Sequence, residues 1–274
     1  MRVGSKFLFS LFICNVICAG VLVGQELKPS PYNFNWKHDA IYASGALALT
    51  GIGYFTAQQV TGYSEATLLT LDKYELPGVD RGTVGNWRPA SAMASDYAVF
   101  ASAAMPLLML ADKRARHDWL GLAFMYVEVA GVTIGLSELS KGLARRARPY
   151  AYDPEVPMAE RLDSDARKSF FSGHTATAAA MCFLTAKVFS DYSDNRTAEA
   201  LVWTGAILAP AVVGYLRVDA GQHFPSDVIA GYLIGGAIGY LVPELHKKKN
   251  LPKGLTLSPF GSASGTGIYL SYRL

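Results

Sequence analysis

Three short clusters of Lys, Arg, His, Ser and Asp interrupt an otherwise apolar chain. They are K-x6-R-P at Lys141, Arg148 and Pro149, then Ser172-Gly173-His174, then R-x5-H-x3-D at Arg217, His223 and Asp227. Guanidinium groups bind phosphate oxygens in a forked geometry and a lysine adds a point charge. A histidine can attack, donate a proton or accept one near neutral pH. Each cluster is ordinary by itself, so its chemistry depends on what the fold places beside it.

Six apolar, Ala/Leu-rich segments bounded by charged residues or Pro and Gly must position these clusters. They run approximately over residues 41–57, 97–111, 119–139, 174–190, 199–216 and 228–243. Their length and composition predict helices, mostly somewhat shorter than the roughly 20 residues of a bilayer span. Both thin membrane spans and the core helices of a soluble bundle fit this pattern. The expected fold class is therefore all-α, a bundle of about six apolar helices.

The clusters fall at particular ends of these segments. If each segment crosses the bundle once, the end of the third, the start of the fourth, the end of the fifth and the start of the sixth meet at one end. Two histidines, one aspartate and three cations would then converge, which suits the oxygens of a phosphate. Gly173 would let the N–H groups that begin the fourth helix approach an anion closely. Ser172-Gly173-His174 therefore predicts an anion cradle with a proton donor beside it.

The amino-acid composition indicates which classes of binding partner are expected. Hydrophobic residues make up 51% of the 274 residues, charged residues only 17%, and the net charge is +3. No stripe of Lys and Arg is interleaved with stacking aromatic residues, which argues against nucleic-acid binding. Nothing in the sequence identifies a protein partner. A membrane-associated protein or a helical periplasmic one is expected.

The two ends of the chain differ from its middle. Arg2 and Lys6 precede an apolar run, so we predict that residues 1–24 are a signal peptide or N-terminal anchor and that the protein is exported. Only Cys182 lies beyond that segment, so no disulfide is expected within the processed chain. Residues 25–250 form the predicted helical domain. Residues 251–274 alternate polar and apolar around Gly and Ser, which indicates a C-terminal tail with a β-hairpin.

The ordered clusters resemble the signature of the type 2 phosphatidic acid phosphatase and vanadium haloperoxidase superfamily. That signature is K-x6-R-P, then P-S-G-H, then S-R-x5-H-x3-D, and the resemblance covers roughly residues 95–245. Two supporting positions depart from it, because Phe171 replaces the proline before Ser172 and Leu216 replaces the serine before Arg217.

The resemblance implies a role for each residue of the clusters. His223 would attack phosphorus and form a phosphohistidine, and Asp227 would hold its other ring nitrogen. His174 would protonate the leaving oxygen and then activate water. The remaining residues would hold the phosphoryl oxygens, namely Lys141, Arg148, Ser172, Gly173 and Arg217. This mechanism uses no metal and no other cofactor.

The function expected from this resemblance is hydrolysis of a phosphomonoester or diphosphate. The substrate would be a lipid phosphate at the outer face of the cytoplasmic membrane, of the phosphatidate, polyprenyl diphosphate or lipid A type. A soluble periplasmic acid phosphatase of broad specificity is the alternative, and a vanadium haloperoxidase shares the same pocket. Residues 58–96 and 140–173 are long loops, where substrate selection is expected.

Basic residues indicate which side of the membrane the clusters face. Lys113, Arg114 and Arg116, together with the HKKK run at 246–249, lie at the end of the bundle away from the clusters. The positive-inside rule then places the clusters outside the cytoplasm. An exported N-terminus followed by six spans would place them inside. Either segment 41–57 does not span, or the processed chain is a periplasmic helical protein, and both resolutions keep the site outside.

Overall fold

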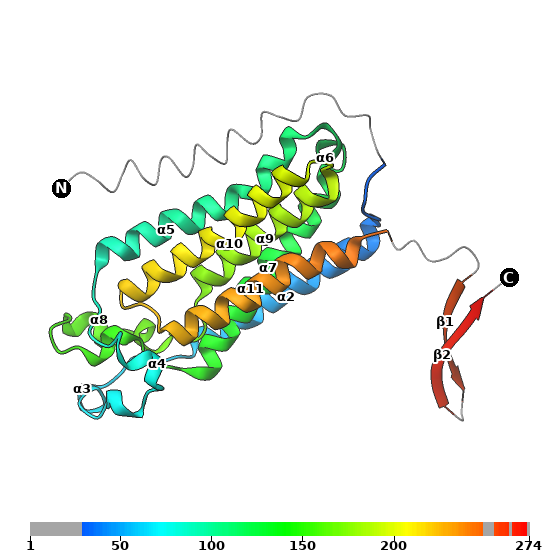
Figure 1. The fold of residues 1–274 in the computed structure, drawn as a ribbon. Helices are drawn as coiled ribbons and strands as arrows, with labels where there is room; N and C mark the ends of the chain where they lie inside the picture. Colours follow the sequence, from blue (N-terminus) through cyan, green and yellow to red (C-terminus); the bar gives the residue numbers. More distant parts are fainter. Residues whose placement is uncertain (1–28, 249–254, 263–264, 273–274) are drawn as a thin grey trace.

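Within the part of the chain that the structure describes, six long helices form the bundle, as the apolar segments predict (Figure 1). The computed structural model describes residues 29–248, 255–262 and 265–272. The long helices are α2 (Trp36–Gln58), α5 (Pro89–Ala104), α7 (Trp119–Ala144), α9 (Gly173–Tyr192), α10 (Arg196–Asp219) and α11 (Pro225–His246). Helix α5 runs on into the 3-10 helix η3 (Met105–Ala111). The predicted all-α bundle is confirmed.

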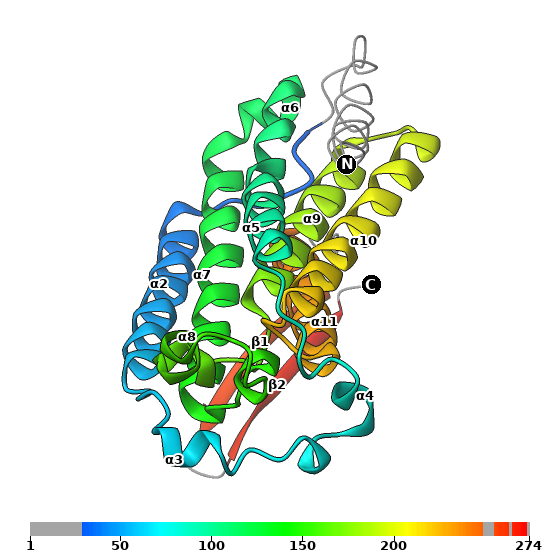
Figure 2. The same ribbon diagram turned by 90° about the vertical axis from the view of Figure 1, so that its left-hand side faces the viewer.

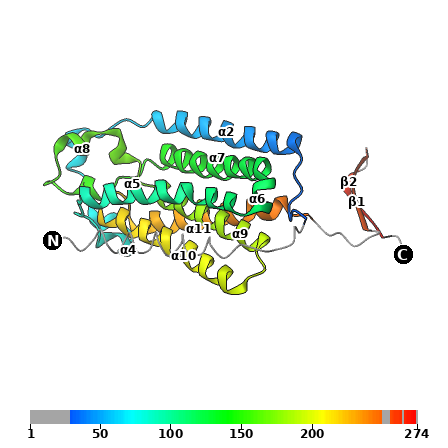
Figure 3. The same ribbon diagram turned by 90° about the horizontal axis from the view of Figure 1, so that it is seen from above.

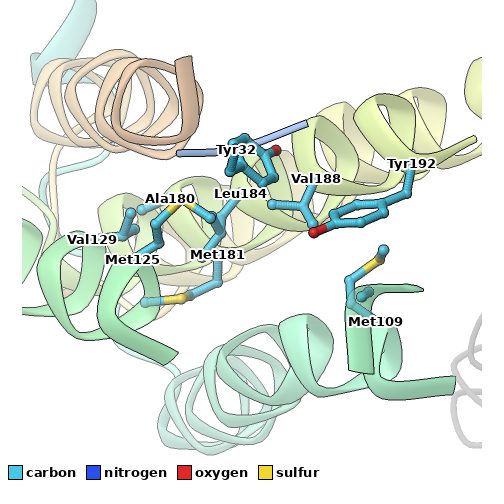
Figure 4. Close-up of a cluster of buried hydrophobic side chains, with 10 residues drawn as sticks. Tyr32, Met109, Met125, Val129, Ala180, Met181, Leu184, Val188 and Tyr192 are labelled. Carbon is cyan, nitrogen blue, oxygen red and sulfur yellow. The ribbon is translucent and has the colours of Figure 1, made fainter. Parts of the chain in front are cut away.

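Helix α9 lies at the centre of the bundle and packs against α11, α10, α7 and α5. It lies between α7 and α10 in Figure 2. Most of its side chains are buried, and many are alanines. Met181 and Leu184 project from it into the main hydrophobic cluster, which also contains Met125 of α7 and Met109 of η3 (Figure 4). The second half of α9 is therefore anchored in the main hydrophobic cluster.

Helices α11 and α9 approach each other closely, and this sets their relative position. Gly231, Gly235 and Gly239 lie on one face of α11, and each packs against a backbone carbonyl group of α9. A Cβ atom at Gly231 would lie 2.5 Å from the carbonyl oxygen of Ser172. Only residues without a side chain permit this spacing. The glycines thus bring the Ser-Gly-His cluster against the helix that carries Asp227.

The outer faces of the bundle are apolar. Phe55 of α2, Phe100 of α5 and Leu233 of α11 are each more than 60% exposed. Five of the described helices are long and apolar enough to cross a membrane, and they lie at 36–58, 89–111, 119–152, 196–219 and 225–246. The enclosed helix α9 is not among them. This apolar surface is typical of a membrane-associated protein.

Short helices cover one end of the bundle, where the two long loops were expected (Figure 3). They are α3 (Glu65–Leu68), η2 (Lys73–Glu75), α4 (Gly78–Arg81), η4 (Pro149–Tyr152), α8 (Met158–Leu162) and η5 (Ser164–Arg167). Helix α6 (Lys113–His117) lies at the other end. The chain turns sharply at Gly221, where φ is +72° and a Cβ atom would lie 1.7 Å from the carbonyl oxygen of Asn86. The loop containing Asn86 is thereby packed onto the turn that precedes His223.

The alternating residues near the C-terminus form two paired strands. β1 (Leu255–Ser262) and β2 (Gly265–Tyr272) are antiparallel, and Leu255 pairs with Tyr272 at the open end. Their pairing agrees with the hairpin indicated by the sequence. The predicted N-terminal segment 1–24 lies outside the described residues.

Candidate active site

The three clusters meet at the end of the bundle that the short helices cover. Lys141 belongs to the last turn of α7, Ser172 caps α9, Arg217 lies in the last turn of α10 and Asp227 lies in the first turn of α11. His223 stands in the turn between α10 and α11. The expected convergence is thus what the fold produces, because consecutive long helices run in opposite directions.

His223 is fully enclosed, with 1% of its surface exposed. Its ring nitrogen Nδ1 lies 2.7 Å from the backbone carbonyl oxygen of Ser169. A carbonyl oxygen can only accept a hydrogen bond, so Nδ1 carries the hydrogen and donates it. In the neutral ring this leaves a lone pair on Nε2. The contact therefore fixes the tautomer in which Nε2 can act as a nucleophile.

Asp227 does not hold the ring of His223 directly, and the expected contact between these two side chains is corrected here. Its Oδ2 atom accepts hydrogen bonds from the Ser169 hydroxyl at 2.6 Å and from the Phe224 backbone N–H at 2.9 Å. Its Oδ1 atom pairs with Arg146. Both carboxylate oxygens thus accept from donors other than the imidazole. Asp227 thus supports the residue whose carbonyl group orients His223.

Arg146 links this support to the loop that precedes α5. Its guanidinium group pairs with Asp227 and, at 2.7 Å, with the buried Asp80 of α4. Asp80 also accepts hydrogen bonds from the backbone N–H and the hydroxyl of Ser226, at 3.0 and 2.7 Å. Arg146 further stacks over the ring of Phe224, with 4.5 Å to the centroid. This network holds the first turn of α11 in place.

His174 has an acidic partner on α5. Its Nε2 atom lies 2.8 Å from Oδ1 of Asp96, and the same oxygen lies 3.6 Å from a guanidinium nitrogen of Arg217. Since a carboxylate accepts, Nε2 donates to it. The other ring nitrogen, Nδ1, is then the atom of His174 that can exchange a proton. Asp96 connects one histidine and one cation of the predicted clusters.

The three cations of the clusters are buried beside one another, and each has neighbours on the protein. Lys141 pairs with Glu138 at 2.6 Å. Arg148 bonds the backbone and carboxylate of Asp165 at 2.8 and 2.9 Å. A side-chain oxygen of Gln222 accepts from Arg148 and, at 3.3 Å, from Arg217.

One hydrogen-bond donor of Arg217, its buried Nε atom, has no partner among the described residues. A buried donor without a partner is costly, so this atom favours an anion at the site. Among the described residues, no three His, Cys, Asp or Glu side chains are arranged to hold a metal ion.

Ser172 and Gly173 shape the start of α9. The Ser172 hydroxyl caps the helix by accepting a hydrogen bond from the Thr175 backbone N–H at 3.4 Å. The backbone N–H of Ser172 donates to the backbone carbonyl oxygen of Asp227 at 3.1 Å. A Cβ atom at Gly173 would lie 2.7 Å from the Ser137 hydroxyl oxygen and 3.3 Å from Nζ of Lys141. Gly173 thus leaves room for the Lys141 ammonium group at the positive end of α9.

The cations depress the pKa of both histidines. Burial lowers the pKa of His223 well below its usual value, and the nearby charges of Arg148, Arg217 and Lys141 lower it further. Burial also lowers the pKa of His174, to about 4, with Arg217 and Lys141 acting in the same direction and Asp96 opposing them. Both rings are therefore neutral near pH 7. Arg217 and Lys141 therefore act on both imidazoles, and Arg148 acts on His223.

Three residues of this site were missed by the sequence analysis, namely Asp96, Arg146 and Ser169. Asp96 stands just before the segment that was expected to begin at residue 97, and Arg146 lies within the K-x6-R-P stretch. Their charges were visible in the sequence, but their partners were not. Ser169 contributes a backbone carbonyl group, which no residue type encodes.

Known proteins are similar in sequence to part of this chain. Residues 119–251 match the family model of the PAP2 superfamily. An undecaprenyl-diphosphatase of Sulfolobus acidocaldarius is 29% identical over 149 residues, covering 53% of this chain and 64% of that protein. A lipid A 1-phosphatase of Rhizobium etli is 31% identical over 139 residues, covering 49% of this chain and 53% of that protein. The chain thus spans between half and two thirds of the length of these relatives.

No solved structure was found to match the chain significantly. The matched region 119–251 contains all three clusters and four of the six long helices, and Asp96 lies before it. Over residues 119–251, just under half of its length, this chain is similar to the PAP2 superfamily.

Proposed function

We propose that the protein is a phosphatase that hydrolyses a lipid phosphate or diphosphate through a phosphohistidine. The observation that carries the proposal is the burial of three cations around two histidines whose tautomers are both set by their hydrogen-bond partners. Each cation has a carboxylate neighbour, but Nε of Arg217 is buried without a hydrogen-bond partner among the described residues. A phosphoryl group would supply an acceptor for this donor, and its oxygens match the forked donors of Arg148 and Arg217.

His223 begins the reaction in this proposal. Its Nε2 lone pair attacks phosphorus, a bond forms between nitrogen and phosphorus, and the bond to the leaving oxygen breaks. The hydrogen on Nδ1 remains bonded to the Ser169 carbonyl oxygen, which stabilises the positive charge that the ring acquires. Because the pKa of His223 is low, the ring is neutral and ready to attack at neutral pH.

His174 carries the proton in both halves of the reaction. Its Nδ1 atom donates a proton to the leaving oxygen and later takes one from the water that cleaves the phosphohistidine. The charge of the bound phosphate offsets Arg217 and Lys141, which lower the pKa of His174. Substrate binding therefore raises that pKa and favours protonation. Asp96 acts in the same direction through its contact with Nε2.

Two observations support a lipid substrate. The outer faces of α2, α5 and α11 expose large apolar side chains, and five described helices are long enough and apolar enough to cross a membrane. Two relatives are named for activity on undecaprenyl diphosphate and on lipid A. An enzyme in the bilayer would meet such a substrate by lateral diffusion, with the phosphate at the level of the short helices.

We further propose that the site faces the outside of the cytoplasmic membrane, because helix α6, which begins at Lys113, and the basic residues 246–248 at the end of α11 lie at the opposite end of the bundle. A membrane-impermeant maleimide on intact spheroplasts tests this, since the described part of the chain has one cysteine and it is buried. Glu155→Cys, in an exposed loop at the site, should be labelled directly. Lys113→Cys should be labelled only after permeabilisation. The reverse pattern would place the site in the cytoplasm.

Substitution of each histidine, assayed on two kinds of ester, tests the mechanism. His223→Ala removes the nucleophile and should abolish turnover of alkyl and aryl phosphates alike. His174→Ala removes a general acid, which contributes about 10²- to 10⁴-fold and matters most for a poor leaving group. This variant should lose alkyl phosphate hydrolysis yet retain cleavage of p-nitrophenyl phosphate, with phosphohistidine accumulating at His223.

A matched control separates these roles from damage to the fold. His117→Ala changes an exposed histidine at the far end of the bundle and should leave both activities unchanged. If His223→Ala keeps activity on the aryl ester while His174→Ala loses it, the assignment of nucleophile and acid is wrong.

A further inference from the structure

A second cavity lies at the end of the bundle opposite the active site. It has a volume of about 360 Å³ and lies between η3, α6, α7 and α9. Its wall includes Leu107 and Leu110 of η3, Leu122 of α7 and Leu184 of α9. The volume is within the range of sites that hold small ligands. The mechanism proposed above makes no use of this cavity.

The inner wall of the cavity belongs to the main hydrophobic cluster. Met109, Leu184 and Val188 line the cavity and are also members of that cluster (Figure 4). Met109 projects from η3 toward Val188 and Tyr192 in this view. An apolar wall of this kind offers few hydrogen-bond partners to a ligand. A flexible hydrocarbon chain fits it better than a polar metabolite does.

The rim of the cavity has a different character. Of the described residues that line it, Arg116 carries a charge, and Trp119 beside it is 57% exposed. Both lie where α6 passes into α7, at the end of a helix long enough and apolar enough to span a membrane. Tryptophan favours the level of the lipid head groups, and a basic residue beside an apolar pocket there favours an anionic head group.

We propose that this cavity binds an anionic phospholipid, with one acyl chain against Leu122 and Leu184 and the head-group phosphate at Arg116. Charge complementarity and the continuity of the cavity with the apolar outer surface both argue for this occupant. The site is distinct from the catalytic one, so the lipid here would be a bound component of the protein rather than its substrate. The proposal does not depend on the function proposed above.

A photoactivatable phosphatidylglycerol with a diazirine in one acyl chain tests the proposal. The full-length protein is reconstituted into vesicles of phosphatidylethanolamine containing the probe, irradiated, digested and analysed by mass spectrometry. Labelling should concentrate on the residues that line the cavity. A phosphatidylethanolamine probe of the same chain length should label them several-fold less.

Two variants and their controls make the test specific. Ala123→Phe fills the cavity and should abolish labelling there, whereas Ala211→Phe, on the exposed face of α10, should not. Arg116→Gln should reduce labelling by phosphatidylglycerol about fivefold, whereas Lys113→Gln, in the same basic turn but outside the cavity lining, should reduce it less. All four variants should keep the Tm and the elution volume of the unaltered protein in detergent, which checks that they fold.

Three outcomes would overturn the proposal. Equal labelling in Ala123→Phe and the unaltered protein would mean that no chain enters the cavity. Equal labelling by the two lipid probes would mean that Arg116 does not select an anionic head group. Cross-links from a photoreactive residue placed at position 123 to residues 1–24 would assign the cavity to the N-terminal segment of the chain instead.

Discussion

The imidazole of His223 is oriented by a backbone carbonyl group, that of Ser169, at 2.7 Å from Nδ1. Asp227 acts one step further away, through the Ser169 hydroxyl. A carbonyl group is neutral, so it fixes the tautomer without adding a negative charge beside the imidazole. The low pKa of His223 follows from this, because burial and three cations are not offset by a carboxylate in contact with the ring.

This relationship predicts unequal effects of two substitutions. Ser169→Ala removes the hydroxyl group and keeps the carbonyl group, so kcat should fall by less than about tenfold. Asp227→Asn disturbs Ser169, Arg146 and the Phe224 N–H together, so kcat should fall by about 10- to 100-fold, as for other groups that orient a functional side chain. Single-turnover rates on p-nitrophenyl phosphate measure both. A greater loss for Ser169→Ala than for Asp227→Asn would contradict the relay.

The contact between Asp96 and His174 predicts a change in pH dependence. The carboxylate raises the pKa of His174 against the lowering by burial and Arg217. Asp96→Asn should lower this pKa, so less of the acid form is present at a given pH. The limb of the pH profile that reports His174 should shift to lower pH, and alkyl phosphate hydrolysis at pH 7 should fall about tenfold or more.

The control for this change is Glu155→Gln, which neutralises an exposed carboxylate in a loop at the same end of the bundle. It should leave the pH profile in place. The aryl ester should also respond less than the alkyl ester to Asp96→Asn, because its leaving group needs less protonation. An unshifted profile with a uniform loss of rate would mean that Asp96 only stabilises the fold.

Asp96 lies in a part of helix α5 that the sequence pattern did not predict to be helical. The apolar run predicted a helix from residue 97, whereas α5 begins at Pro89, and proline is well suited to the first position of a helix. The first turns of α5 are polar because Ser91, Ser95 and Asp96 face other side chains rather than lipid. A pattern of apolar residues therefore places the start of this helix too late, and with it a member of the site.

The three clusters lie together in the fold because the direction of the helices alone brings their ends together. What periodicity could not provide is which donor meets which acceptor. Arg146 is one of several cations in its stretch, yet it pairs with Asp80 and Asp227 while Arg148 pairs with Asp165. The difference depends on the path of the chain after α7, where Arg145 has a φ of 47° and ends the helix. That path is a tertiary property.

Gly173 and Gly231 offer the last test, because a methyl group would meet different kinds of atom at each. At Gly173 the nearest atoms are the Ser137 hydroxyl and the Lys141 ammonium group, both at the ends of side chains that can move. Gly173→Ala should therefore fold normally and displace Lys141. A misplacement of about 1 Å can cost a hundredfold in rate, so kcat/KM should fall by about 10- to 100-fold with little change in Tm.

At Gly231 the nearest atom is the backbone carbonyl oxygen of Ser172, at 2.5 Å from the added Cβ. The two helices would have to separate, so Gly231→Ala should lower the free energy of unfolding by about 1–3 kcal/mol, seen as a fall in Tm. Ser137→Ala added to Gly173→Ala relieves the closer of its two contacts and should restore part of kcat/KM, but it cannot help Gly231→Ala. If Gly173→Ala instead loses stability as Gly231→Ala does, the glycine serves helix packing, and its role beside Lys141 is refuted.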